Sequence, residues 1–391
     1  MYAAFINNMS KNIYLDYAST TFIKEEVLKE MMPYLTEHFG NPSSIHSMSR
    51  EVKKAVYDAK IRTAKAINGS REEIFFTSGG TEADNWAIKG VVFRNRDKGN
   101  HIITTKIEHH AILNSCKYLE EQGFKVTYLP VDEEGIIKIE DLKNAITKDT
   151  ILVSIMFGNN EVGSIQPIKE IGKICREKNI IFHTDGVQAV GSVPIDVNEL
   201  NIDLLSMSAH KFYGPKGVGA LYIRKGTKIH NLIHGGSQER ARRSGTENVP
   251  GIVGLGKAIE LASESLEKER VRLTHLRDKL IDGLLKIPNS KLNGPIGEKR
   301  LPGNVNISFK DVNGGTMLMA LDEMGIFASA GSACTAGSLE PSHVLLSLGL
   351  PEDMARSSVR FTMGAKTTEE EIDYVIDVMP KIVERIRNTN I

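Results

Sequence analysis

The chain has 391 residues, of which 41% are hydrophobic and 25% charged, a composition typical of a globular protein large enough for two domains. Lysine plus arginine and aspartate plus glutamate both number 49, so the formal net charge is zero and gives no support to a nucleic-acid or anionic-membrane surface. The longest apolar runs, such as ILVSIMF, fall far short of the ~20 residues that span a bilayer, so no membrane association is expected. The opening MYAAFINNMSKN lacks the basic start and apolar core of a secretory signal, and we expect a cytoplasmic protein.

Between about residues 70 and 225, short β-rich runs alternate with helical patterns. The runs are EIFFTS, HIITTKIE, KVTYLPV, TILVSIMF, IIFHTD, DLLSMSA and GALYIRK. Such alternation predicts crossover units and a mostly parallel sheet. The last two runs are joined by a short Gly-Pro-rich turn, which predicts one antiparallel strand at that point.

The C-terminal third has a different pattern. Residues 256–287 have apolar positions at helical spacing and predict one long helix. A turn-rich passage, the strand-like runs VNISF and SSVRFTM and a final helix from about Thr368 follow. We therefore expect a large domain over residues 16–262 and a smaller α+β domain formed by residues 1–15 and 263–391.

Two residues at strand ends suggest a cofactor. Lys211 follows the apolar run LLSMSAH, and Asp185 ends the strand-like NIIFHTD, where open α/β folds bind ligands. Taken singly, Lys211 is as well explained as a turn lysine, like Lys216, and Asp185 as a helix cap. Together they match the lysine and carboxylate that a pyridoxal phosphate site requires.

Further polar residues fit the same site. Gly79, Gly80 and Thr81 lie in a strand–turn–helix pattern that can hold a phosphate at a helix N-terminus. His109 begins another helical pattern; it is a cap or surface residue, or it stacks on a flat ring and relays protons. Arg360, opposite Val359 and Phe361 in an alternating strand, is an exposed strand residue or a partner for an α-carboxylate.

The three cysteines fall into two groups. Cys116 and Cys175 recur at helical spacing with apolar residues and are predicted to lie in the core. Cys334 stands among small residues in SAGSACTAGSLEP, a setting that suits either a passive loop cysteine or a nucleophile. Their number and spacing predict neither a disulfide framework nor a resident metal site.

The chain resembles a cysteine desulfurase of the NifS/IscS type over nearly its whole length. The resemblance is carried, in order, by YLDYASTT, GNPSSIH, FTSGGTEADN, NNEVGSIQP, HTDGVQAVG, SAHKFYGPKGVGALY, RRSGTEN, GSACTAGSLEPSHVL and VRFTMG. It implies the aspartate aminotransferase-like fold type I of pyridoxal-phosphate-dependent transferases, with a large, mixed, mostly parallel seven-stranded sheet domain and a smaller α+β domain.

The resemblance also implies a role for each matching position. Lys211 would be the Schiff-base lysine, Arg360 would hold the substrate carboxylate, and Cys334 would accept the sulfur and is allowed as a transient iron–sulfur ligand. Thr246 would reach the phosphate of a neighbouring subunit, which implies a homodimer. The other implied contacts are Gly80, Thr81, Ser208 and His210 at the phosphate, His109 on the ring, Asn160 beside cofactor and substrate, Asp185 at the pyridine nitrogen and Gln188 at the ring hydroxyl.

The implied activity is conversion of L-cysteine to L-alanine with formation of a Cys334 persulfide. The sulfur would pass to an acceptor protein, such as an iron–sulfur scaffold or a thiolation enzyme. Which pathway it serves stays open, because the given sequence ends at VERIRNTNI, before the extension with which housekeeping members of the family dock their scaffold. The alternatives are another enzyme of this fold, such as an aminotransferase or selenocysteine lyase, and a sulfur-carrier subunit without turnover. A dinucleotide oxidoreductase is disfavoured because its glycine fingerprint is missing.

Overall fold

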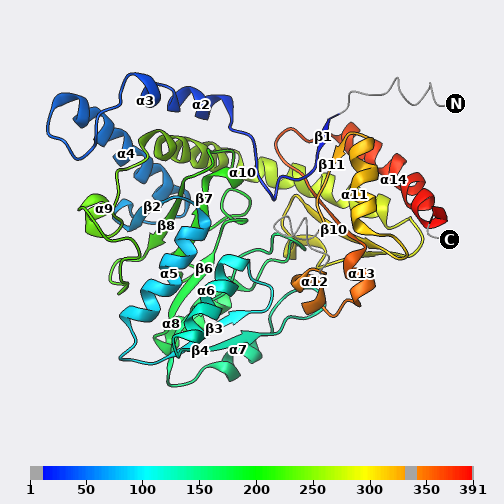
Figure 1. Cartoon of the computed structure of the whole chain (residues 1–391), viewed down its shortest axis with the longest axis horizontal. Coiled ribbons are helices and arrows are strands. Elements are labelled where there is room, and N and C mark those ends of the chain that lie inside the picture. The colour runs from blue at the N-terminus through cyan, green and yellow to red at the C-terminus, as the bar shows by residue number, and fades with distance from the viewer. Residues whose placement is uncertain (1–11, 331–340, 390–391) are drawn as a thin grey trace.

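The computed structural model describes residues 12–330 and 341–389, and its main feature is a seven-stranded sheet (Figure 1). In spatial order its strands are β2 (Ile74–Thr77), β8 (Gly219–Ile223), β7 (Leu204–Ser208), β6 (Ile181–Asp185), β5 (Thr150–Ser154), β3 (His101–Thr105) and β4 (Lys125–Leu129). Strand β8 is antiparallel to both β2 and β7, whereas the other neighbouring pairs are parallel. The predicted mixed sheet is confirmed, including its antiparallel strand after the Gly-Pro-rich turn.

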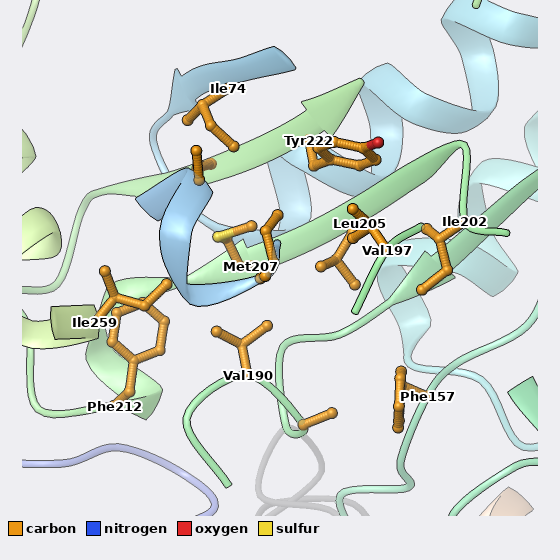
Figure 2. Close-up of a cluster of buried hydrophobic side chains, with 14 of the residues drawn as sticks. Ile74, Phe157, Val190, Val197, Ile202, Leu205, Met207, Phe212, Tyr222 and Ile259 are labelled. Carbon is orange, nitrogen blue, oxygen red and sulfur yellow. The ribbon is translucent and has the colours of Figure 1, made fainter. Parts of the chain in front are cut away.

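Helices cover both faces of this sheet because its strands carry apolar side chains on both sides. Leu204 packs against α5 (Gly80–Arg94) and α6 (His110–Glu121), whereas the next residue, Leu205, packs on the opposite face. That second face is covered by α4 (Ser47–Ala66), α8 (Ile168–Lys178) and α10 (Val249–Leu284). Figure 2 shows part of this layer, in which Leu205 and Met207 lie near one another. The shorter helices of this region are α2 (Glu25–Met31), α3 (Pro33–Thr36), α7 (Ile139–Ala145) and α9 (Gln238–Ala241).

Two small sheets lie beyond α10. One is antiparallel, with the order β12 (Ser358–Thr362), β10 (Asn304–Phe309), β9 (Ser290–Leu292), and the other pairs β1 (Ile13–Tyr14) in parallel with β11 (Ile326–Phe327). Their own apolar core includes residues of α10 and of the C-terminal helix. The helices of this region are α11 (Gly314–Glu323), α12 (His343–Ser347), α13 (Glu352–Arg356) and α14 (Glu369–Thr389).

Helix α10 joins the two regions (Figure 1). Its first part belongs to the core under the large sheet, and Leu276, Leu280 and Leu284 belong to the core of the smaller region. The helix begins at Val249 rather than at residue 256, because the Asn248 side chain accepts a hydrogen bond from Gly251 N at 3.2 Å and caps it earlier. The predicted domain boundary after residue 262 falls within this helix and stays a prediction.

The two cysteines predicted for the core, Cys116 and Cys175, are both buried and free. Burial raises the pKa of the Cys116 thiol to about 12, so it is inert as a nucleophile. Cys334 lies outside the described residues. Among the helices that the structure describes, none combines the length and apolar composition needed to cross a membrane.

Candidate active site

Ten of the residues singled out in the sequence line one cavity of about 360 Å³ at the carboxyl edge of the large sheet. Asp185 ends β6, Ser208 ends the neighbouring parallel strand β7, and Lys211 lies in the short 3₁₀ turn that follows. The other predicted residues in its lining are Gly80, Thr81, His109, Asn160, Gln188, His210 and Arg360. The structure brings these residues together, and the individual roles given to them stay predictions.

The start of α5 forms a narrow cradle beside Ser208. Gly79 adopts φ 153° and ψ −176°, a conformation that is essentially restricted to glycine. A β-carbon on Gly79 would lie 3.8 Å from Ser208 Oγ, and one on Gly80 would lie 2.7 Å from Val187 Cγ2. The backbone can therefore approach a ligand at a helix N-terminus, the arrangement that favours a phosphate.

Lys211 is held at the cavity by the backbone of the segment that follows β1. Its ammonium group donates to Ser19 O at 2.9 Å and also to Ala18 O. Gln188 Nε2 donates to the same Ala18 carbonyl at 3.0 Å. Lys211 is therefore half-buried and oriented towards the cavity rather than exposed in a turn, as Lys216 is.

Asp185 is the buried anion of the site. Its Oδ1 accepts a hydrogen bond from Val187 N at 2.9 Å. Burial raises the pKa of Asp185, while His109, the Val187 hydrogen bond and Lys211 lower it. A bound cation facing this carboxylate would favour its ionised form further. Asp185 is thus placed to stabilise positive charge in the cavity.

A second buried carboxyl group lies behind this anion. Burial, followed by the nearby charge of Asp185, raises the pKa of Asp84 well above its usual range. His183 lies 3.7 Å from Asp84 Oδ1 and contacts Ser154 Oγ at 2.9 Å and Ser206 Oγ at 3.0 Å. Burial lowers the pKa of His183 to about 3, so its ring is neutral. Asp84 is therefore the carboxyl group of the pair that more strongly favours its protonated form, because His109 and Lys211 offset the burial of Asp185 but not that of Asp84.

His109 is the N-cap of α6. Its Nδ1 accepts a hydrogen bond from Ala111 N at 3.1 Å, so the proton of the neutral ring is on Nε2. Burial lowers the pKa of His109; the charge of Asp185 opposes this shift, and Lys211, His110 and His343 add to it. The His109 ring therefore carries an N–H donor at Nε2 on the wall of the cavity.

Arg360 enters the cavity from β12. Val359 and Phe361 on either side of it are part of the smaller core, so the alternation expected from the sequence is confirmed. The Arg360 guanidinium is 1% exposed, and it donates to Asp16 Oδ1 at 2.8 Å, Ser19 Oγ at 2.9 Å and Asn160 O at 3.0 Å. Such a planar, fully charged group is well suited to bind a carboxylate.

Sequence reasoning missed several titratable groups in the same lining, among them the buried Asp84, Glu108 and Glu161 and the half-buried His343. Burial raises the pKa of Glu108 to about 8, although its carboxyl accepts from Thr105 Oγ1 at 2.7 Å and Met156 N at 3.0 Å. Glu161 accepts from Ser342 Oγ at 2.5 Å. An available signal was that Glu108 and Glu161 directly adjoin the predicted site residues His109 and Asn160.

Thr246 is the exception among the described site residues. It lines a different hollow with Ser78 and Arg243 and is not part of the cavity that contains Lys211. Arg243 binds Glu82 of α5 through two hydrogen bonds of 2.8 and 2.9 Å. Within one chain, therefore, Thr246 is not assembled with the other predicted phosphate contacts.

Comparisons with known proteins agree with this architecture. The aminotransferase class-V family model matches residues 13–375. The chain belongs to that family and, within it, to the cysteine desulfurases of the NifS/IscS type.

The chain is 63% identical over 381 residues to a cysteine desulfurase IscS of Clostridium botulinum, covering 97% of this chain and 96% of that protein. A NifS-like protein superposes with a TM-score of 0.89 at 42% identity, covering 96% of this chain and 99% of that one. SspA, solved in complex with cysteine, superposes with a TM-score of 0.80 at 37% identity, covering 90% and 98%.

Enzymes of this family depend on pyridoxal phosphate, and the residues present fit that group. The glycine-restricted backbone at Gly79 and the hydroxyls of Thr81 and Ser208 suit its phosphate. Asp185 suits its ring nitrogen, and Lys211 is available for covalent attachment.

Proposed function

We propose that this chain is a pyridoxal-phosphate-dependent cysteine desulfurase, a sulfurtransferase that converts L-cysteine to L-alanine and leaves the sulfur on Cys334 as a persulfide. The observation that carries the proposal is that Lys211, Asp185 and Arg360 line one cavity. They come from the large sheet and from the small antiparallel sheet, and together they provide a covalent anchor, a buried anion and a carboxylate-binding cation. The names of the 63%-identical relative and of the cysteine complex support the choice of cysteine as substrate.

The cavity supports a division of labour among its residues. When bound to Lys211, the cofactor supplies an electron-accepting ring. Asp185 would stabilise the protonated ring nitrogen of that cofactor, and Thr81 and Ser208 would hold its phosphate. Arg360 binds the α-carboxylate of L-cysteine, and the Lys211 amine moves a proton from the substrate α-carbon and delivers one to the β-carbon.

The overall reaction balances without an external oxidant. The substrate carbon–sulfur bond breaks, a sulfur–sulfur bond forms to Cys334, and the β-carbon gains the proton that makes alanine. Reduction of the carbon is matched by oxidation of the two sulfurs. The attacking group must be a thiolate, so one proton has to leave the Cys334 thiol before attack.

The chain on either side of Cys334 supports its assignment as acceptor, although residues 331–340 lie outside the described part of the structure. Before this segment, Ser329 pairs with Arg360, with N–O distances of 3.1 and 2.7 Å between their backbones. After it, His343 lines the cavity. The described residues on both sides of Cys334 therefore lie beside the proposed substrate site.

A homodimer is part of the proposal. Thr246 does not line the cavity of its own chain, which suits a contact with the phosphate of a second subunit. Large apolar side chains are also exposed along residues 28–48, with Phe39 71% and Ile45 94% exposed. A second subunit would remove such a surface from water. Sedimentation analysis of the cofactor-loaded protein tests this point, and a monomer at micromolar concentration would contradict it.

The proposed setting is the cytoplasm, where free thiols such as Cys116 and Cys175 stay reduced. There the persulfide sulfur would pass to an acceptor protein of iron–sulfur cluster assembly, in keeping with the relatives named IscS, or of a thio-cofactor or tRNA thiolation pathway.

The test is brief exposure of wild type and Cys334→Ser to L-cysteine without reductant. Peptide mass spectrometry and an alanine assay are run on the same samples. We expect one added sulfur on the Cys334 peptide, and alanine that is formed by the wild type and largely lost in the variant. Equal alanine from both proteins would overturn the acceptor role and favour a lyase or aminotransferase.

A further inference from the structure

Tyr213 lies in the same turn as Lys211, and the reaction outlined above gives it no role. Its hydroxyl oxygen accepts a hydrogen bond from Ala365 N at 2.7 Å. Ala365 comes shortly after β12, the strand that carries Arg360. A side chain of the turn that holds Lys211 therefore reaches directly to the segment that follows the Arg360 strand.

The backbone at Tyr213 is held in a strained conformation. Its φ is 68°, in the left-handed region that a bulky side chain rarely adopts. Tyr213 N donates to Thr21 Oγ1 at 3.0 Å, and Tyr213 O accepts from Lys24 N at 3.2 Å. Such strain persists only where the surrounding structure fixes it, so the direction of the Tyr213 side chain is set by these contacts.

Aromatic neighbours pack against the Tyr213 ring. Its centroid lies 5.3 Å from that of Phe22 and 6.2 Å from that of Tyr17. Lys24 Nζ lies 5.0 Å from the same centroid. Burial raises the pKa of Tyr213, so the phenol stays neutral while its oxygen accepts from Ala365 N. The hydroxyl is therefore a fixed acceptor rather than a mobile surface group.

The hydrogen bond of the Tyr213 hydroxyl crosses a gap in the packing. Tyr213, Thr362 and Ala365 line a second cavity, of about 100 Å³. Lys211 lines this cavity as well as the candidate active site. Where side chains do not fill the space between two segments, hydrogen bonds rather than close packing determine their separation. One such link is the Tyr213–Ala365 bond, and another is the bond from Ala18 N to Thr362 Oγ1 at 2.9 Å.

The two links depend differently on Lys211. The Lys211 amine donates to Ala18 O, so its attachment to the cofactor would give up a bond that steadies Ala18. The Tyr213 hydroxyl bond does not involve that amine. We propose that Tyr213 is a positioning residue, whose hydroxyl holds the Lys211 turn at the correct distance from the Arg360 strand. The inference rests on the proposed function, which assigns the cofactor to Lys211 and the substrate carboxylate to Arg360.

The informative substitution is Tyr213→Phe, which keeps the ring and removes the acceptor for Ala365 N. The readout is the change in cofactor absorption when an amine is added to the cofactor-loaded protein, and it requires no turnover. Two amines are compared: L-alanine, and ethylamine, which is the same molecule without the carboxylate. Only L-alanine can engage Arg360 as well as the cofactor, so the ratio of the two dissociation constants measures the contribution of the carboxylate.

We expect Tyr213→Phe to raise the dissociation constant of L-alanine roughly 3- to 10-fold, the effect of one lost hydrogen bond, and to leave that of ethylamine unchanged. The KM for L-cysteine should rise by a similar factor, with a smaller change in kcat. In a protein that already carries Arg360→Lys, Tyr213→Phe should weaken L-alanine binding less, because both substitutions act on the same carboxylate contact.

Tyr128→Phe is the matched control. The Tyr128 hydroxyl donates to Glu120 Oε2 at 3.0 Å, but Tyr128 lies on the edge strand β4 and lines neither cavity. This variant loses one hydrogen-bonded hydroxyl and should keep the affinities of the wild type for both amines.

Equal losses of affinity for both amines in Tyr213→Phe, or an unchanged affinity for L-alanine, would overturn the inference. If Tyr213→Phe fails to fold, Thr21→Val decides, because it removes the acceptor that holds Tyr213 N; an unchanged ratio of the two dissociation constants would then reject the positioning role. A wild type that binds L-alanine through its carboxylate but forms no alanine from L-cysteine would instead refute the proposed activity and leave this inference in place.

Discussion

The cavity has a floor and a wall that are built in different ways. The residues at strand ends and at the start of α5 are called the cofactor floor: Gly80, Asp185, Ser208 and Lys211. The substrate wall consists of Asp16, Asn160 and Arg360. The floor comes from strand ends and one strand–helix turn of a single sheet. In the wall, Arg360 bonds to Asp16, 344 residues away in the chain, and to the Asn160 carbonyl, 200 residues away. The residues proposed to hold the cofactor thus depend on local topology, and those proposed to bind the substrate depend on long-range packing.

The largest effect is expected at the floor, from Lys211→Ala. Loss of the anchoring amine and of its proton transfers should lower alanine formation by 10⁴-fold or more, equivalent to more than about 5 kcal/mol. The cofactor absorption band should change at the same time. Turnover by each purified, cofactor-reconstituted protein is the measurement. Lys216→Ala is the control, since Lys216 is exposed in the same turn-rich stretch and should keep near wild-type activity.

A second test concerns how the free energy of unfolding depends on pH. It uses Glu108, a buried carboxyl group in the lining of the same cavity. Burial raises the folded-state pKa of Glu108 from 4.5 to about 8, so above about pH 4.5 the unfolded chain releases a proton that the folded chain retains. The free energy of unfolding should therefore decrease as the pH rises towards 8, by at most about 5 kcal/mol from this group. Glu108→Gln resembles the protonated acid and should lack this decrease.

Urea denaturation of the cofactor-free wild type and Glu108→Gln at about pH 5 and about pH 8 measures the difference. The control is Glu133→Gln, because Glu133 is exposed and should leave the pH dependence unchanged. A wild type and Glu108→Gln with parallel pH profiles would show that Glu108 is ionised in the folded protein.

The contrast between the cofactor floor and the substrate wall also explains which site residues could be predicted from the sequence. Asp185 and Lys211 follow recognisable strands, and parallel strands end at one edge, so their proximity follows from topology alone. Residue type and alternation placed Arg360 on the correct face of β12, but nothing in β12 indicates that its partner is Asp16 near the N-terminus. That contact depends on how the small sheets pack, so the sequence analysis did not predict it.

Buried polar residues were the hardest to predict. Asp84 lies in a helical pattern with nothing in its neighbours to show that it faces Asp185 and His183. His343 follows Pro341 and Ser342 in what reads as an ordinary helix start. Their significance arises from neighbours that are distant in sequence, so neither periodicity nor local spacing carries it. The helix α10 shows a local failure, because the Asn248 cap was overlooked.

A third test addresses the wall through Arg360→Lys. Lysine keeps the charge but loses the planar pair of donors, so it should bind the α-carboxylate less well. We expect the KM for L-cysteine to rise roughly 10- to 100-fold, corresponding to about 1.4 to 3 kcal/mol, with a smaller change in kcat. Steady-state kinetics at saturating cofactor measure both constants. A fall in kcat at unchanged KM would mean that Arg360 acts on the chemistry instead of on binding.

The smallest effects are expected from alanine substitutions of Gly79 and Gly80 at the edge of the cofactor floor, and the two should differ in cofactor affinity. Gly79 has φ 153°, so Gly79→Ala forces a side chain into a conformation that costs about 1–3 kcal/mol, and cofactor affinity should fall at least several-fold. Gly80 is helical, and the β-carbon of Gly80→Ala meets the movable Val187 side chain at 2.7 Å and lies at an ordinary contact distance of 3.7 Å from Ser208 Cβ. The gain in helix propensity, roughly 1 kcal/mol, offsets that contact, so affinity should change by less than about fivefold. Titration of the cofactor-free proteins, followed by absorbance, distinguishes the two variants. If Gly80→Ala lost more affinity than Gly79→Ala, the close approach of Val187, and not the backbone conformation, would be what shapes this end of the floor.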